Sequence, residues 1–178
     1  HLTALRGLVD MGEDGKALQY IDQLADSPAL RGGRRLCEND AANAVLSAKA
    51  EAMGRAGLEA DFAVILPKEL PLGAADLCAL LGNALDNAME AAEQAEDKKV
   101  VLRCRADKGL FMLRGATAYA GDLPPDLATT KADKASHGFG LTGMREIAQR
   151  LGGSLEVRAS GGRFQLVAGL PLFPAPRP

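Results

Sequence analysis

The chain of 178 residues contains few aromatic side chains, no tryptophan and only two histidines. Aromatic residues make up 4% of it, so it lacks the rings on which proteins stack single-stranded nucleic acid. It also lacks an excess of positive charge, because its formal net charge is −2. Nucleic-acid-binding domains usually carry a basic patch, and we therefore expect no nucleic-acid partner.

Cysteines and long apolar runs are scarce as well. Cys37, Cys78 and Cys104 lie far apart and in no CxxC spacing, which argues against a zinc or redox site. They are expected to be small buried hydrophobic residues in a reducing compartment. No apolar run approaches the ~20 residues that a membrane span needs, and no signal peptide is visible. Because the chain starts at His1 in a helical pattern, we expect it to be part of a longer protein.

The hydrophobic pattern divides the chain into four parts. Two short helical patterns at 1–27 predict a helical hairpin, 28–39 is a predicted linker, 40–171 is the main domain, and 172–178 is a predicted disordered tail. In the main domain the strands come in hairpin pairs and not in βαβ alternation. This predicts an α+β sandwich with a mixed sheet of about five strands packed on three helices. Helices are predicted at 40–54, 73–95 and 140–151, and strands at 58–66, 100–105, 110–116, 154–159 and 163–168.

The helix at 73–95 carries two asparagines one turn apart. Asn83 and Asn87 share a narrow polar line with Glu90 and Gln94, opposite a broad apolar arc. Asparagine is a poor helix former, and this spacing places two amide oxygens side by side. Mg²⁺ takes oxygen ligands and usually shares its shell with substrate phosphates. This polar line is therefore a candidate Mg-nucleotide site. The alternative is that it is a helix face exposed only to solvent. The apolar arc comprises Leu77, Leu81, Ala84, Leu85, Ala88, Met89 and Ala92.

A second candidate is the glycine-rich turn at Gly138, Gly140 and Gly143. The GxGxxG pattern does not indicate a Rossmann site, since no hydrophobic strand precedes it and no acid follows in a βαβ unit. It instead predicts glycines at a helix N-terminus, where free N–H groups attract phosphate. A plain loop-to-helix junction is the alternative. The run before it, 119–138, has no periodicity and is a candidate lid over a ligand.

In this order, the two motifs resemble those of the GHKL ATPase superfamily. LLGNALDNAMEAAE is similar to the family's N box, and HGFGLTGMREIAQRLGGSLEV to its last glycine box. More narrowly, DLCALLGNALDNAMEAA and TTKADKASHGFGL resemble bacterial sensor histidine kinases of the peptide quorum-sensing type. The resemblance implies a two-layer Bergerat-type sandwich that binds ATP with Mg²⁺. It also implies transfer of the γ-phosphate to a histidine and then to a response regulator.

The resemblance also implies roles for individual residues. Asn87, with Asn83 beside it, would coordinate Mg²⁺. The remaining ATP-binding residues would be Lys131, His137, Gly138, Phe139, Gly140 and Leu141. The parent protein would be a homodimer in the bacterial cell membrane, with this part in the cytoplasm and a cognate response regulator as partner.

The chain departs from the superfamily at two points. No DxGxG motif for adenine exists at 113–119, where Thr117 takes the expected position. The phosphoacceptor histidine would lie upstream of His1, so we expect no autophosphorylation by this fragment. Two alternatives therefore stay open: a catalytically weak ATP-binding or dimerisation scaffold, and a GHKL protein serine kinase. The N-terminal hairpin argues against the serine kinase.

Overall fold

The computed structural model describes Met11 and residues 15–16, 35–118 and 138–173. The chain forms two compact units, His1–Arg34 and Arg35–Pro178. The boundary falls inside the predicted linker, so residues 35–39 belong to the second unit. Most of the predicted hairpin at 1–27 lies outside the described residues. Within the described parts of the chain, no helix is long and apolar enough to cross a membrane.

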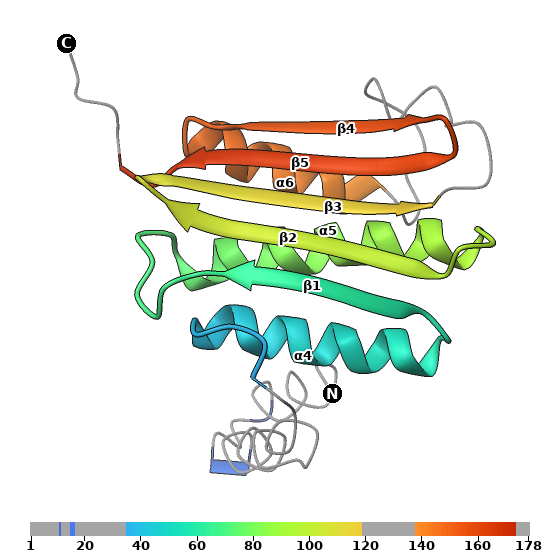
Figure 1. Cartoon of the computed structure of the whole chain (residues 1–178). Helices are drawn as coiled ribbons and strands as arrows, with labels where there is room; N and C mark the ends of the chain where they lie inside the picture. The colour runs from blue at the N-terminus through green and yellow to red at the C-terminus, as the bar shows by residue number, and fades with distance from the viewer. Residues whose placement is uncertain (1–10, 12–14, 17–34, 119–137, 174–178) are drawn as a thin grey trace. The chain divides into compact units, whose positions relative to one another are not determined.

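The second unit is a five-stranded sheet with three described helices (Figure 1). The strand order is β1-β2-β3-β5-β4. This confirms the predicted α+β fold with a mixed sheet. The elements are α4 (Asp40–Arg55), β1 (Glu59–Ile65), α5 (Ala74–Glu93), β2 (Lys99–Asp107), β3 (Leu110–Ala118), α6 (Gly138–Arg150), β4 (Ser154–Ser160) and β5 (Arg163–Pro171).

One strand pair differs from the prediction. β1 pairs with β2 in parallel, with Glu59 opposite Lys99 and Ile65 opposite Arg105. The expectation that the strands come only in antiparallel pairs is therefore wrong here. Parallel neighbours need a crossover connection, and α5 provides it by running between the two strands. The β2–β3, β3–β5 and β4–β5 pairs are antiparallel.

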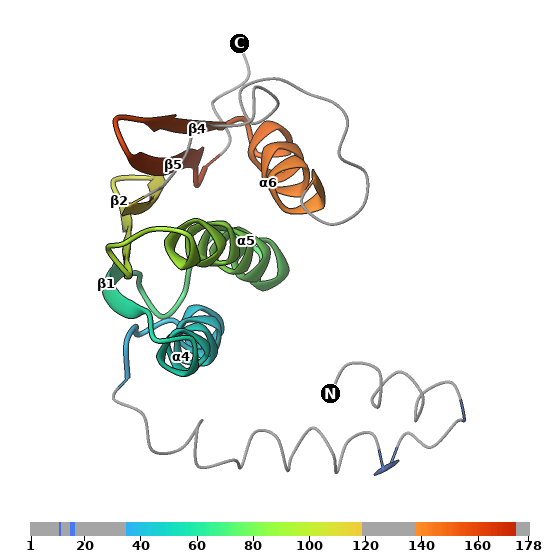
Figure 2. The same ribbon diagram turned by 90° about the vertical axis from the view of Figure 1, so that its right-hand side faces the viewer.

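The three helices cover one face of the sheet, and the core lies between the two layers (Figure 2). Alternate strand residues such as Leu102, Phe111 and Leu166 are fully buried there. The helix α5 lies over the middle of the sheet and supplies much of the core. Every residue of its predicted apolar arc is buried except Met89, which is half-buried against the core. The sequence period thus located the inner face of α5 correctly.

The first helix of the unit begins at a buried cap. Asn39 is 8% exposed, and its Oδ1 accepts a hydrogen bond from the Ala42 backbone N–H at 3.0 Å. Its Nδ2 donates to the Lys68 carbonyl oxygen at 3.1 Å. One side chain therefore caps α4 and also holds the connection between β1 and α5 in place.

Replacing Asn39 with alanine should lower the free energy of unfolding by about 1–2 kcal/mol, because the capping and Lys68 hydrogen bonds are both lost. Urea unfolding followed by circular dichroism measures this change. The control Asn39→Ser keeps an oxygen for the Ala42 N–H but not the donor to Lys68, so its loss should be smaller. An unchanged midpoint for N39A would contradict this role of the cap.

The cysteines are free thiols, and two of them are buried. Cys37 and Cys104 are 6% and 3% exposed, while Cys78 is half-buried between α4 and α5. Burial, with a smaller contribution from Cys37, raises the pKa of the Cys104 thiol to about 12. Cys104 is thus a protonated, unreactive core residue at neutral pH, as predicted for a small buried hydrophobic side chain.

Two residues of the predicted tail are attached to the sheet. The Leu172 N–H donates to the Gly109 carbonyl oxygen at 2.8 Å. The Phe173 ring lies over Gly109, so that a methyl group there would come within 3.1 Å of Phe173 Cδ2. Gly109 has a positive φ of 78°, which favours glycine in this turn. The described unit therefore extends to residue 173, two residues beyond the predicted domain end.

Candidate functional site

The two asparagines of α5 lie on the side of the helix that faces away from the sheet. Both side chains are half-buried, whereas Glu90 and Gln94, farther along the same line, are exposed. The Asn87 Nδ2 amide donates to the Asn83 backbone carbonyl oxygen at 2.6 Å. Within the described residues no hydrogen bond occupies Asn87 Oδ1, so this oxygen is available to a ligand.

The first turn of α6 lies directly against these asparagines. A methyl group at Gly140 would lie 3.1 Å from Asn83 Oδ1 and 3.6 Å from Asn87 Nδ2. A Cβ contact of 3.1 Å is tighter than side chains normally tolerate, so the amides occupy the space that the missing side chain leaves. The structure therefore brings together the two motifs that the sequence indicated separately.

Two ion pairs link α5 to its neighbouring helices. Arg150, in the last turn of α6, contacts Asp76 in the first turn of α5 at 2.6 Å. Lys49 of α4 forms an ion pair with Asp86, next to Asn87. The helices α5 and α6 run antiparallel. The Asp76 contact therefore lies at one end of this helix pair, and the Gly140 contact lies at the other end. No short sequence pattern indicates either ion pair, because the partners lie far apart along the chain.

The start of α6 is suited to an anion. The helix begins at Gly138 and has no acidic residue in its first turn. The first N–H groups of a helix have no partner within the helix, and its dipole places partial positive charge there. Together with the amide oxygens of Asn83 and Asn87, this end of α6 offers donors for phosphate oxygens and neutral oxygen ligands for a magnesium ion. The residues present therefore fit a magnesium nucleotide.

The structure describes the other predicted site residues to different extents. Leu141 is 5% exposed and its side chain packs in the core, so only its backbone faces the site. Phe139 lies in the first turn of α6, but its side chain is outside the described set. Lys131 and His137 lie outside the described residues. Their contacts with ATP remain predictions.

Thr117, at the position expected for adenine recognition, is used within the fold. It is 5% exposed and lies near the end of β3 on the helix-facing side. Its hydroxyl donates to the Lys99 carbonyl oxygen at 2.9 Å, which ties β3 to β2. The hydroxyl proton is thereby engaged, and only the lone pairs of Oγ1 remain for a ligand.

The comparison with protein families decides the wider assignment. A protein-family model described as "GHKL domain" matches residues 72–171. This range is more than half of the chain and includes α5, α6 and four strands. The chain belongs to the GHKL domain family. No curated protein shows significant similarity to its sequence.

Solved structures share the fold of this GHKL domain. The nucleotide-free catalytic domain of the histidine kinase ThkA aligns with a TM-score of 0.63 and 16% identity, over 76% of this chain and 94% of that chain. The Acinetobacter baumannii histidine kinase AdeS aligns with a TM-score of 0.53 and 17% identity, over 96% and 94%. Full-length ShkA in complex with AMPPNP aligns with a TM-score of 0.56 and 20% identity, over 74% and 29%. The fold is that of histidine kinase catalytic domains.

Proposed function

We propose that this GHKL domain is the ATP-binding catalytic region of a two-component sensor histidine kinase. The contact of Gly140 with Asn83 and Asn87 carries the proposal, because it joins a phosphate-binding helix start to two amide oxygens. The fold shared with histidine kinase catalytic domains supports it. The AMPPNP in the ShkA structure agrees with a nucleotide in this fold.

In this proposal the residues of the site act by positioning. Asn87 Oδ1 ligates the metal, with Asn83 beside it, and the N–H groups at Gly138, Phe139, Gly140 and Leu141 hold phosphate oxygens. Lys131 and His137 contact the phosphates from the segment before α6. When bound, magnesium neutralises charge on the phosphates, and phosphoryl transfer then depends mainly on alignment. The acceptor would be a histidine upstream of His1 in a dimeric parent protein, and a response regulator would receive the phosphate.

A second candidate is a GHKL domain with weak catalysis that acts mainly as a scaffold. The observation in its favour is at β3. The aspartate that would recognise adenine is absent there, and no other acidic residue takes its place. The Thr117 hydroxyl already donates to the Lys99 carbonyl oxygen. Adenine would then contribute little affinity. Titration with ATP and with inorganic triphosphate separates the candidates, since equal affinities for both would favour the scaffold.

Replacing Gly140 with alanine should weaken Mg-ATP binding by about tenfold, because the new methyl group displaces the Asn83 amide. The matched control is Gly143→Ala in the same helix, where a methyl group meets nothing within 4 Å. The control should bind ATP normally and gain up to about 1 kcal/mol of stability from better helix propensity. Calorimetric titration of both variants measures the difference. Equal affinities would remove the support that the Gly140 contact gives to the proposal.

We also expect that this fragment does not phosphorylate itself, because the proposed acceptor lies upstream of His1. Incubation with radiolabelled Mg-ATP should therefore give no acid-labile phosphate on the chain, even where binding is saturated. A form that includes the proposed upstream histidine is the positive control and should become labelled. Acid-labile phosphate on His1 or His137 would contradict this expectation.

A further inference from the structure

The sheet has a second face, on which no described helix packs. All three helices lie on the other side of the sheet (Figure 2). The side chains of this open face come from the alternate strand positions that are not buried against the helices. On this open face Leu110 and Met112 of β3 are 43% and 41% exposed, and Ile65 of β1 is 68% exposed. Contiguous exposed apolar side chains rimmed by polar ones mark protein-interaction sites, and Leu110 and Met112 lie close together on β3.

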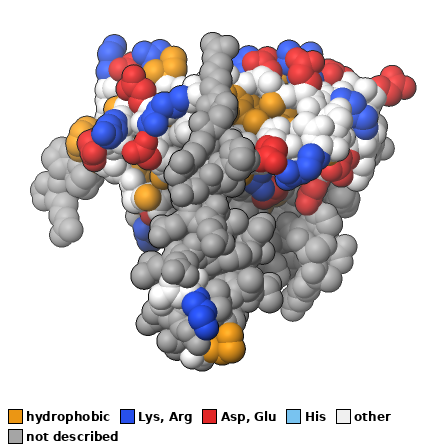
Figure 3. All heavy atoms as spheres, turned by 90° about the horizontal axis from the view of Figure 1, so that it is seen from below, with side chains coloured by type: hydrophobic (Ala, Val, Ile, Leu, Met, Phe, Trp, Pro, Cys, Tyr) orange, Lys and Arg blue, Asp and Glu red, His pale blue; other side chains and the backbone are white. Residues whose placement is uncertain are grey.

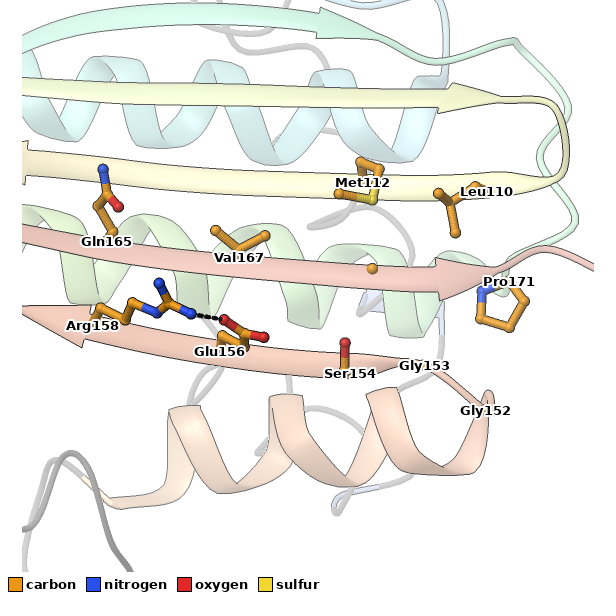
Figure 4. A pocket seen from close by; sticks show the side chains of 11 residues that line it. Leu110, Met112, Gly152, Gly153, Ser154, Glu156, Arg158, Gln165, Val167 and Pro171 are labelled. Carbon is orange, nitrogen blue, oxygen red and sulfur yellow. Dashed lines mark hydrogen bonds and ion pairs between the residues drawn. The ribbon is translucent and has the colours of Figure 1, made fainter.

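A groove of about 720 Å³ crosses this open face over β3, β5 and β4. Leu110, Met112, Val167 and Pro171 form its apolar lining, and the stick view shows them on the neighbouring strands (Figure 4). The hollow exists because Gly169, between Met112 and β4, has no side chain; a methyl group there would lie 3.3 Å from Met112 Sδ.

Charge on the open face is unbalanced. Asp61 lies between Arg103 and Lys99, at 2.9 and 3.2 Å, and hydrogen bonds from Arg103 and then Lys99 lower its pKa, so it stays ionised. Arg105 pairs with Asp107, and Arg158 pairs with Glu156, both at 2.8 Å. Figure 3 shows a different side of the molecule, seen from below relative to Figure 1, where acidic and basic side chains are also interspersed. The acidic side chains of the open face are thus engaged by basic neighbours.

On the open face, two of the described arginines have no ion pair: Arg114 of β3 and Arg163 of β5. Arg114 is the more informative, because it lies directly opposite Arg103 on β2 and beside Val167 of the groove on β5. Like charges directly opposite each other destabilise a sheet. Arg114 therefore places an exposed positive charge without an ion-pair partner at the border of the groove, whose lining is partly apolar and partly polar.

We propose that the open face docks an acidic segment of a partner protein, with an apolar side chain in the groove and carboxylates on Arg114. Arginine suits this role because its planar guanidinium binds a carboxylate with two hydrogen bonds. A second copy of this face fits less well, because it would bring another Arg114 and Arg103 toward the same positive charges. The surface lies on the side of the sheet opposite the helices that carry Asn83, Asn87 and Gly140, so it is separate from the nucleotide site.

The test is a titration of the isotope-labelled chain with a short peptide that has one leucine flanked by glutamates. Amide NMR shifts should move at Met112, Arg114, Val167 and Gly169, and binding should weaken as salt increases. Arg114→Glu should weaken binding by about fivefold or more, and Gly169→Val should weaken it by filling the groove. The matched control Arg55→Glu, on the exposed end of α4, should bind like the wild type. So should Asn87→Ala, which affects only the nucleotide site.

Several results would overturn the proposal. One is equal binding of a peptide with lysines in place of the glutamates. Another is unchanged affinity in Arg114→Glu, provided that its amide spectrum shows an intact fold. Concentration-dependent dimerisation through these residues would assign the face to a second copy. Contacts between the face and residues 1–34 of the same chain would assign it to an intramolecular partner.

Discussion

Replacing Asn87 with alanine should abolish most of the Mg-dependent affinity for ATP. Its Oδ1 accepts no hydrogen bond within the described residues, and the Gly140 turn lies beside its amide group. Loss of one interaction with a charged group costs about 1.5–3 kcal/mol, so affinity should fall about 10- to 100-fold. Stability should hardly change, because alanine is the better helix former by up to about 0.7 kcal/mol.

Calorimetric titration and thermal unfolding together distinguish this loss from misfolding. The matched control is Glu93→Ala, an exposed position in the last turn of the same helix whose side chain makes no described contact. It should keep wild-type affinity within about twofold, since solvent-exposed charges contribute little. An Asn87→Ala variant with the ATP affinity of the wild type would show that Asn87 is not the metal ligand, even if other residues bind the nucleotide.

Replacing Gly153 with alanine should be the most damaging single methyl addition in the described unit. The new Cβ would lie 2.2 Å from the Gly169 carbonyl oxygen and 2.9 Å from Leu170 Cα. Both are backbone atoms, so β4 has to move away from β5. The Gly153 N–H also donates to the Ala148 carbonyl oxygen at 2.8 Å, and the Gly152 N–H donates to the Gln149 carbonyl oxygen at 3.0 Å. Gly152 has a φ of 72°. Together these features end α6 in a Schellman motif.

The expected loss is about 3 kcal/mol or more, at the upper end of what overpacking costs. For a chain of this size that corresponds to a fall in Tm of roughly 6–12 °C. Gly143→Ala, with an empty surrounding, is again the control and should raise Tm slightly. A Gly153→Ala protein with the Tm of the wild type would show that β4 packs against β5 less closely than described.

The sequence predicted local structure better than strand neighbours. The period of α5 located its buried face, and the predicted hairpin pairs correspond to the β2–β3 and β4–β5 pairs of the sheet. The parallel pairing of β1 with β2 was missed because the partner of an isolated strand depends on where the crossover helix packs, which no short pattern reports. Residues 35–39 were assigned to the linker although Cys37 and Asn39 are buried, since their contacts come from residues far along the chain.

The candidate site was predictable in part. Asn83, Asn87 and Gly140 were each indicated by residue type and spacing, but only the fold shows that Gly140 meets both asparagines. The Arg150–Asp76 pair, which fixes α6 beside α5, joins residues with no shared motif. Leu141 was expected at the nucleotide, yet its leucine side chain is a core residue. Lys131 and His137 stay predictions, to be tested by substitution.

The most direct test of the site is a calorimetric titration of the wild-type chain with ATP, in magnesium and again in EDTA. The account predicts one saturable binding event in magnesium and affinity at least about tenfold lower in EDTA, because the asparagines act through the metal. Amide NMR shifts should fall on α5 and on the first turn of α6. No binding at saturating Mg-ATP, or binding that is indifferent to magnesium, would contradict the assignment of Asn83, Asn87 and Gly140 as a Mg-ATP site.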